Sequence, residues 1–167
     1  GSNGSSGTSG TSGSSGTSGS AGTSGIAAGQ IYYFNQSVSA GVNSYRELAI
    51  YPTAASQTGI TLNLNGNSTG HTVSTFLTPQ LGFNVIPGGT QRFHLHFLKQ
   101  ASNDHVFAQV GIRLTDSTGT PIWSEVLSTP SLIGWDNSST SVEVQTDLVL
   151  PTTTIDPTNR MLVTIYL

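Results

Sequence analysis

The sequence predicts an all-β protein in which an extended, collagen-like stalk precedes a single β-sandwich head of the jelly-roll type. Glycine recurs at every third position through the opening residues, which is typical of such a stalk. From Gln30 onward, short apolar runs alternate with Gly, Pro, Asn and Ser, and no run has the 3.6-residue period of an amphipathic helix. We therefore divide the chain into a stalk at 1–27 and a head at 28–167.

The stalk prediction depends on an unbroken register of glycines. In a collagen triple helix only glycine fits at the crowded axis, so a strict Gly-X-Y repeat implies three associated chains. The repeat lacks proline, which normally preorganises the extended backbone, so we expect it to need support from a trimeric head, sugar or lateral packing. A flexible Gly/Ser linker of similar composition remains the alternative. The predicted axis residues are Gly1, Gly4, Gly7, Gly10, Gly13, Gly16, Gly19, Gly22 and Gly25.

The head prediction depends on strand-length apolar runs separated by turn residues. A chain of 167 residues has room for one core beside the stalk. Asp116 and Gly119 bracket a predicted hairpin turn, and Pro87 breaks the chain before the run at 90–98, which alternates cleanly from Arg92 to Phe97. The last run is apolar throughout, and we expect it to be an interior strand. The expected strands are 31–38, 45–51, 59–64, 72–77, 90–98, 106–114, 121–127, 142–150 and 161–167.

Charge and composition exclude several classes of function. Only 8% of residues are charged and the net charge is -3, so no basic stripe is present to neutralise phosphates, and we expect no nucleic-acid partner. The chain has no cysteine and therefore neither a disulfide nor a Cys-ligated metal site. No apolar run approaches the roughly 20 residues of a membrane span, so we expect no membrane insertion.

We expect no enzymatic activity, no catalytic residue and no cofactor. The sequence contains no Gly-x-Ser-x-Gly elbow, Walker phosphate loop, His-Glu-x-x-His or dinucleotide-binding glycine motif. Acidic residues are scattered, and nothing in the spacing brings two of them together as a hydrolytic pair.

One pair of side chains has metal-ligand spacing. His94 and His96 project from the same face of the predicted strand at 90–98, and three copies around an axis would supply six imidazoles. Two polar residues on a solvent-facing strand have the same pattern, so we predict no metal site and retain this pair as the candidate.

Aromatic and hydroxyl side chains suggest two further roles. Tyr32, Tyr33 and Phe34 follow the stalk, and we expect them to anchor its junction with the head, with carbohydrate stacking as the alternative. Candidate glycosylation sites are the stalk threonines and the Asn-x-Ser/Thr sequons, namely Thr8, Thr11, Thr17, Thr23, Asn3, Asn35, Asn67 and Asn137.

A family resemblance follows from these residues. The repeat, as in Gly7-Thr8-Ser9, joined to a β-rich head resembles the fibre proteins of viruses, especially bacteriophages, and the collagen-like glycoproteins of bacterial surfaces. The stalk match covers 1–27, and the phrase at 31–37 looks like the start of the domain that follows such repeats in phage proteins. The resemblance implies a trimer with an extracellular, virion or cell-surface location.

The sequence is therefore compatible with three functions. The first is a trimeric attachment fibre whose stalk presents the head to a cell-surface glycan or receptor. The second is a subunit of a self-assembling extracellular filament in which stalk and head pack between protomers. The third is a lectin-like or carbohydrate-active domain on a linker, which requires exposed aromatics and paired acids in a groove.

Overall fold

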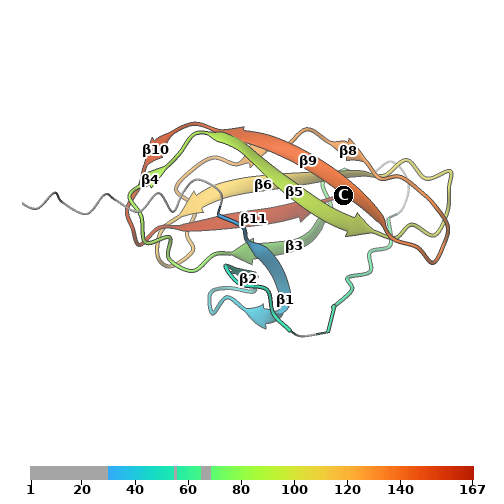
Figure 1. The fold of residues 1–167 in the computed structure, drawn as a ribbon, viewed down its shortest axis with the longest axis horizontal. Coiled ribbons are helices and arrows are strands. Elements are labelled where there is room, and N and C mark those ends of the chain that lie inside the picture. Colours follow the sequence, from blue (N-terminus) through green and yellow to red (C-terminus); the bar gives the residue numbers. More distant parts are fainter. Residues whose placement is uncertain (1–29, 55, 65–68) are drawn as a thin grey trace, which may run out of the picture.

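A computed structural model describes residues 30–54, 56–64 and 69–167 of the chain. In these ranges every regular element is a β-strand, so the all-β prediction is confirmed (Figure 1). The predicted stalk at 1–27, with its axis glycines, lies outside the described residues.

The larger of the sheets is mixed and has seven strands. All of its pairings are antiparallel except that of β2 with β3, which is parallel, and the short strand β8 (Ser131–Leu132) pairs with the start of β6. The order of the other strands is β1 (Tyr33–Ser39), β2 (Arg46–Ala49), β3 (Thr72–Leu77), β11 (Arg160–Tyr166), β6 (Phe107–Thr115) and β7 (Val126–Leu127).

A long antiparallel pair, β5 (Gly89–Phe97) with β9 (Val142–Leu150), forms a second layer that crosses over the large sheet (Figure 1). Its register runs from Gly89 opposite Leu150 to Phe97 opposite Val142 without a bulge. The remaining pair, β4 (Val85–Ile86) with β10 (Thr153–Thr154), is short and immediately precedes β5 and follows β9.

The hydrophobic core lies between these two layers. Strict alternation puts Leu95 of β5 and Val144 of β9 in the core, together with Val110 and Ile112 of β6 and Val163 of β11. The apolar strand at the end of the sequence is the central strand of the large sheet, paired on both sides, so its predicted interior position is confirmed.

An aromatic contact joins the first strand to both layers. Phe34 meets Phe76 of β3 edge to face, with ring centroids 4.8 Å apart, and lies 6.5 Å from Phe93 of β5. Edge-to-face pairs add to the free energy of area burial. Phe34 therefore holds β1 under the β5–β9 layer.

Two strand predictions are wrong. Residues 59–64 form no strand, although their pattern is that of one, because no described strand lies beside them to accept their hydrogen bonds. The run at 121–127 is reduced to a bridge at Pro121 and the two residues of β7, since the amides of Ile122 and Trp123 both donate to the one carbonyl of Leu114 and so form no regular ladder with β6. The turn at Asp116–Gly119 is confirmed by a 3.1 Å hydrogen bond from the Gly119 amide to the Asp116 carbonyl.

Candidate binding surface at one end of the head

Two loops meet at one end of the head and enclose a shallow hollow of about 310 Å³. One loop joins β5 to β6, and the other follows β8. We call this the tip hollow, and its lining residues are Lys99, Ser102, Asp104, His105, Leu132, Ile133, Gly134 and Trp135.

Hydrogen bonds between backbone groups hold the two loops together. The Ile133 amide donates to the Val106 carbonyl at 2.9 Å, directly beyond the pairing of Phe107 with Leu132. Within the first loop, the Lys99 ammonium donates to the Asp104 carbonyl at 2.8 Å. The two loops of the tip hollow are thus tied together next to the paired ends of β6 and β8, which favours a fixed geometry.

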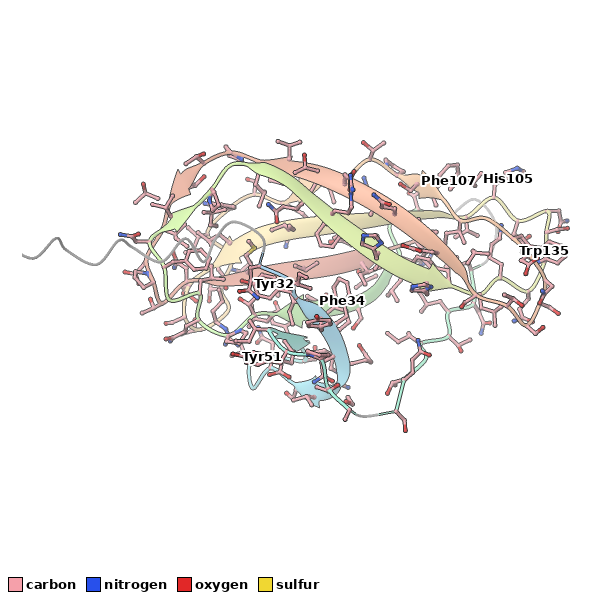
Figure 2. The ribbon with its side chains drawn as sticks, viewed as in Figure 1. Tyr32, Phe34, Tyr51, His105, Phe107 and Trp135 are labelled. Atoms are coloured by element: carbon pink, nitrogen blue, oxygen red, sulfur yellow. The ribbon has the colours of Figure 1, made fainter. Side chains whose placement is uncertain are left out.

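Apolar and polar side chains lie next to each other around the tip hollow. Phe107, Leu132 and Trp135 are large apolar residues with 48%, 53% and 43% of their surface exposed. Figure 2 shows His105, Phe107 and Trp135 at the same end of the molecule. Aromatic faces beside a few polar groups are the usual lining of a ligand site.

The strand directions place the tip hollow far from the first described residue. β3 and β6 both run antiparallel to β11 between them, so they begin at one end of the sheet and finish at the other. Residues 78–81 directly follow β3 and line a smaller hollow together with Gln30. Gln30 therefore lies at the opposite end of the head from the tip hollow, which lies where β6 begins.

The predicted His pair lies on the exposed outer face of β5. His94 Nδ1 is 2.5 Å from Glu143 Oε1, and His96 lies opposite Glu143 in the strand register. The bond from His94, together with the positive charge that either imidazole carries when protonated, holds the pKa of Glu143 below its usual value. His94 Nδ1 is thus engaged in a hydrogen bond to a carboxylate on the neighbouring strand.

A second charged pair lies on the same outer face. Arg92 Nε is 3.0 Å from Asp147 Oδ1, and this hydrogen bond, followed by the charge attraction, raises the pKa of Arg92. Both side chains are largely exposed, so the pair contributes little to stability. Among the described residues, no group of three or more His, Cys, Asp or Glu side chains has the spacing of a metal site.

The three aromatic residues that were predicted to anchor the junction differ in how deeply they are buried. Tyr32 and Phe34 are partly buried against the core, whereas Tyr33 is 38% exposed.

The predicted glycosylation site Asn35 is only 5% exposed, and its side-chain nitrogen donates to Glu47 at 3.0 Å, so a sugar on this nitrogen would displace that bond. Asn137 lies on an exposed loop, where its side-chain oxygen Oδ1 accepts from the Ser139 amide. Its side-chain nitrogen donates to Asp136 and Thr140, bonds that a sugar on this nitrogen would also disturb. The other glycosylation candidates lie outside the described residues.

A scan against protein-family models, a search of curated proteins and a search of solved structures each found no match to this chain. Over the described ranges, no helix is long and apolar enough to cross a membrane. The case for a binding surface therefore depends on the geometry of the head.

Sequence reasoning did not assemble the tip hollow. It gave His105 no special weight, because a lone histidine beside turn residues carries no pattern. Trp135 follows Gly134 and precedes Asp136 in a polar segment, and a tryptophan in such a loop is a usable signal, since core positions normally take that side chain. The pairing of Phe107 with Leu132, which joins the two loops, has no signature in local sequence.

Proposed function

We propose that this chain is a structural attachment protein and not an enzyme. Three copies associate through the Gly-X-Y repeat, and each head presents its tip hollow to a glycan on a biological surface. The observation that supports the proposal is that Gln30 and the tip hollow lie at opposite ends of the head.

The distance between those ends suits a spacer. β6 has nine residues, which at about 3.3 Å each gives a strand of about 30 Å. A repeat that enters beside Gln30 would leave the tip hollow facing away from the point of attachment. A triple helix of the predicted stalk would add about 80 Å at about 3.1 Å per residue.

The lining chemistry favours a carbohydrate ligand. The indole of Trp135 offers a flat apolar face on which a sugar ring can stack. Around it, Lys99 and His105 can donate to hydroxyl or carboxylate oxygens, and Asp104 can accept from hydroxyls. A shallow, open hollow with this mixture suits a polar ring better than a hydrophobic ligand.

Finer features of the proposal rest on the resemblance to fibre proteins. We propose a closed homotrimer, a jelly-roll relationship between the two layers, and an extracellular, virion or cell-surface location. The 8% of charged residues supports this reading, because the surface must then consist mainly of neutral hydroxyl and amide groups that tolerate close packing between copies.

The second candidate function is a subunit of an extracellular filament. It is favoured by large apolar side chains left exposed around β1 and β2, among them Ile31 at 63% and Tyr51 at 73%. Exposed apolar side chains that cluster mark protein contacts. In this alternative stalk and head pack between protomers, and the contacts continue as an open series instead of closing into a trimer.

A glycan-binding experiment on the full chain tests the attachment proposal. Immobilised glycans of diverse composition are exposed to the unmodified chain, to Trp135→Ala and to Tyr51→Ala, which removes an aromatic of greater exposure away from the tip hollow. We expect binding that falls at least tenfold in Trp135→Ala and is unchanged in Tyr51→Ala. Equal binding by all three proteins, or binding by none, would contradict the proposal, and release of sugar from the array would restore the enzyme hypothesis.

A further inference from the structure

Residues 59–64 have the sequence of a strand without a partner. Ile60, Leu62 and Leu64 alternate with polar residues, yet Ile60 and Leu62 are 40% and 37% exposed. No backbone group in this segment makes a hydrogen bond to another described residue. An extended segment with solvated backbone groups and one apolar face is able to add to the edge of a sheet.

The topology shows that this segment occupies the place of a crossover strand. β2 and β3 are parallel neighbours, so residues 50–71 must return the chain across the sheet between them. Such crossovers usually carry a regular element over one face of the sheet. A connection of this length whose described residues, 50–54, 56–64 and 69–71, form no helix or strand is uncommon inside a compact domain.

The β5–β9 layer offers the matching edge. β5 pairs only with β9 among the described strands, so its other edge is unpaired over nine residues and is not interrupted by a bulge. Phe93 and Phe97 of β5 are only partly buried, whereas Leu95 is 6% exposed. An added strand would complete the burial of both phenylalanines.

β1 and the outer edge of β9 are the competing edges, and both are less suitable. The inward side chains of β9 from Val144 to Leu150 are already buried, so a strand added there would cover little apolar surface. The pairing of β1 with β2 shifts register between Asn35 and Ser39, and an irregularity of this kind disrupts the backbone groups that a new strand needs. β5 presents a regular ladder, so the complementarity is better there.

We propose that residues 59–64 of one copy add to the free edge of β5 in a second copy of this chain, forming a third strand of the β5–β9 layer. Ile60 and Leu64 then lie beside the two phenylalanines, one each, and Leu62 lies beside Leu95 between them. Thr61 faces solvent with the histidines of β5. The segment carries no charge, so no charged side chain is buried at the contact. This interface is separate from the tip hollow and does not depend on glycan binding.

The symmetry of the assembly follows from this exchange. Each copy would donate one strand and accept one through a different edge, so two copies can exchange strands reciprocally or several copies can join head to tail. Three copies held together by their stalks would close this contact into a ring, and copies not held in that way would extend it as a filament.

Cysteine cross-linking in the full chain tests the interface, because the natural sequence has no cysteine. Chains with Thr61→Cys are refolded together with chains carrying His94→Cys, His96→Cys or Gln145→Cys, and mixed disulfides are identified by mass spectrometry. Gln145 is the matched control, because it is exposed on the outer face of β9, one strand farther from the added strand. A disulfide needs Cβ atoms about 3.5–4.5 Å apart, and strands are spaced about 4.8 Å.

We expect mixed disulfides with a cysteine on β5 at a yield at least tenfold above that with Gln145→Cys. A donor chain with Asn63→Cys should form the same mixed disulfides, and adding Thr61→Pro to that chain should abolish the disulfides, since proline removes a backbone hydrogen-bond donor. Position 61 is exposed in the single chain, so the proline should not disturb the fold of the head. Absence of a mixed disulfide at both β5 positions would overturn the proposal. A disulfide within one chain, in a Thr61→Cys/His96→Cys variant at high dilution, would also overturn it.

Discussion

The Tyr166 hydroxyl donates a 2.7 Å hydrogen bond to Glu125 Oε1 and so joins the central strand to the segment before β7. The other carboxylate oxygen accepts from the Arg113 guanidinium at 3.3 Å. Burial, and then the bond to Glu125, raise the pKa of Tyr166. These residues lie on the face of the large sheet opposite the core, where they fix the Glu125 side chain over β6.

The first prediction concerns Gly111, which lies beneath the Glu125 carboxylate. A Cβ at this position would fall within 3 Å of three Glu125 side-chain atoms, so Gly111→Ala must displace the carboxylate from Tyr166 and Arg113. We expect the free energy of unfolding to fall by about 1–3 kcal/mol, measured by urea denaturation. The matched control is Gly134→Ala, whose Cβ would have its nearest neighbour at 4.0 Å and should change stability by less than about 0.5 kcal/mol. Equal losses in the two variants would contradict this account.

The second prediction concerns the aromatic contact between the layers. Phe34→Ala removes the ring that meets Phe76 and Phe93, and we expect a loss of about 2–4 kcal/mol in the free energy of unfolding. Tyr51→Ala deletes a ring that is 73% exposed and should cost less than about 0.5 kcal/mol. Thermal and urea unfolding of both variants measure the difference, and a Phe34→Ala protein as stable as the unmodified chain would show that β1 is not held by this contact.

The third prediction concerns stability in acid. Hydrogen bonds from the Thr118 hydroxyl and from the Thr120 amide lower the pKa of Asp116, and bonds from the Thr158 hydroxyl and amide lower that of Asp156. A carboxyl with a lowered pKa in the folded state stabilises the protein above its unfolded pKa of about 4, and this stability is lost as the pH falls through the folded value. We expect the urea midpoint to drop below about pH 4.

An Asp116→Asn/Asp156→Asn variant provides the comparison in acid. Asn keeps an acceptor oxygen for the same turn amides but does not titrate, so its urea midpoint should depend less on pH than that of the unmodified chain. Parallel pH profiles for the two proteins would show that these turns do not contribute to acid sensitivity.

Much of the strand pattern can be predicted from the sequence because burial on one face leaves a period of two. The run at 90–98 alternates cleanly from Arg92 to Phe97, the run at 142–150 alternates over its first half, and the structure pairs them as β5 and β9. The run at 72–77 matches β3 in both bounds. In these segments local pattern and tertiary packing agree.

The failures have a common physical cause, which is that pairing partners are not encoded locally. Residues 59–64 have a strand pattern and no described partner, and β8 is a strand only because Ser131 and Leu132 lie beside β6. The tip hollow depends on the same non-local pairing, so its side chains, Lys99 and Trp135 among them, show no common motif in the sequence.

A trimer that holds its heads by one end is tested by the mass of the full chain, measured by light scattering over a range of concentrations, with electron microscopy of the same samples. A maleimide-gold label on Ser102→Cys marks the tip hollow in the images. We expect a constant mass of three chains and a thin rod with gold at the end of the head far from the rod. A mass of one chain at every concentration, or gold at the junction of rod and head, would contradict this arrangement.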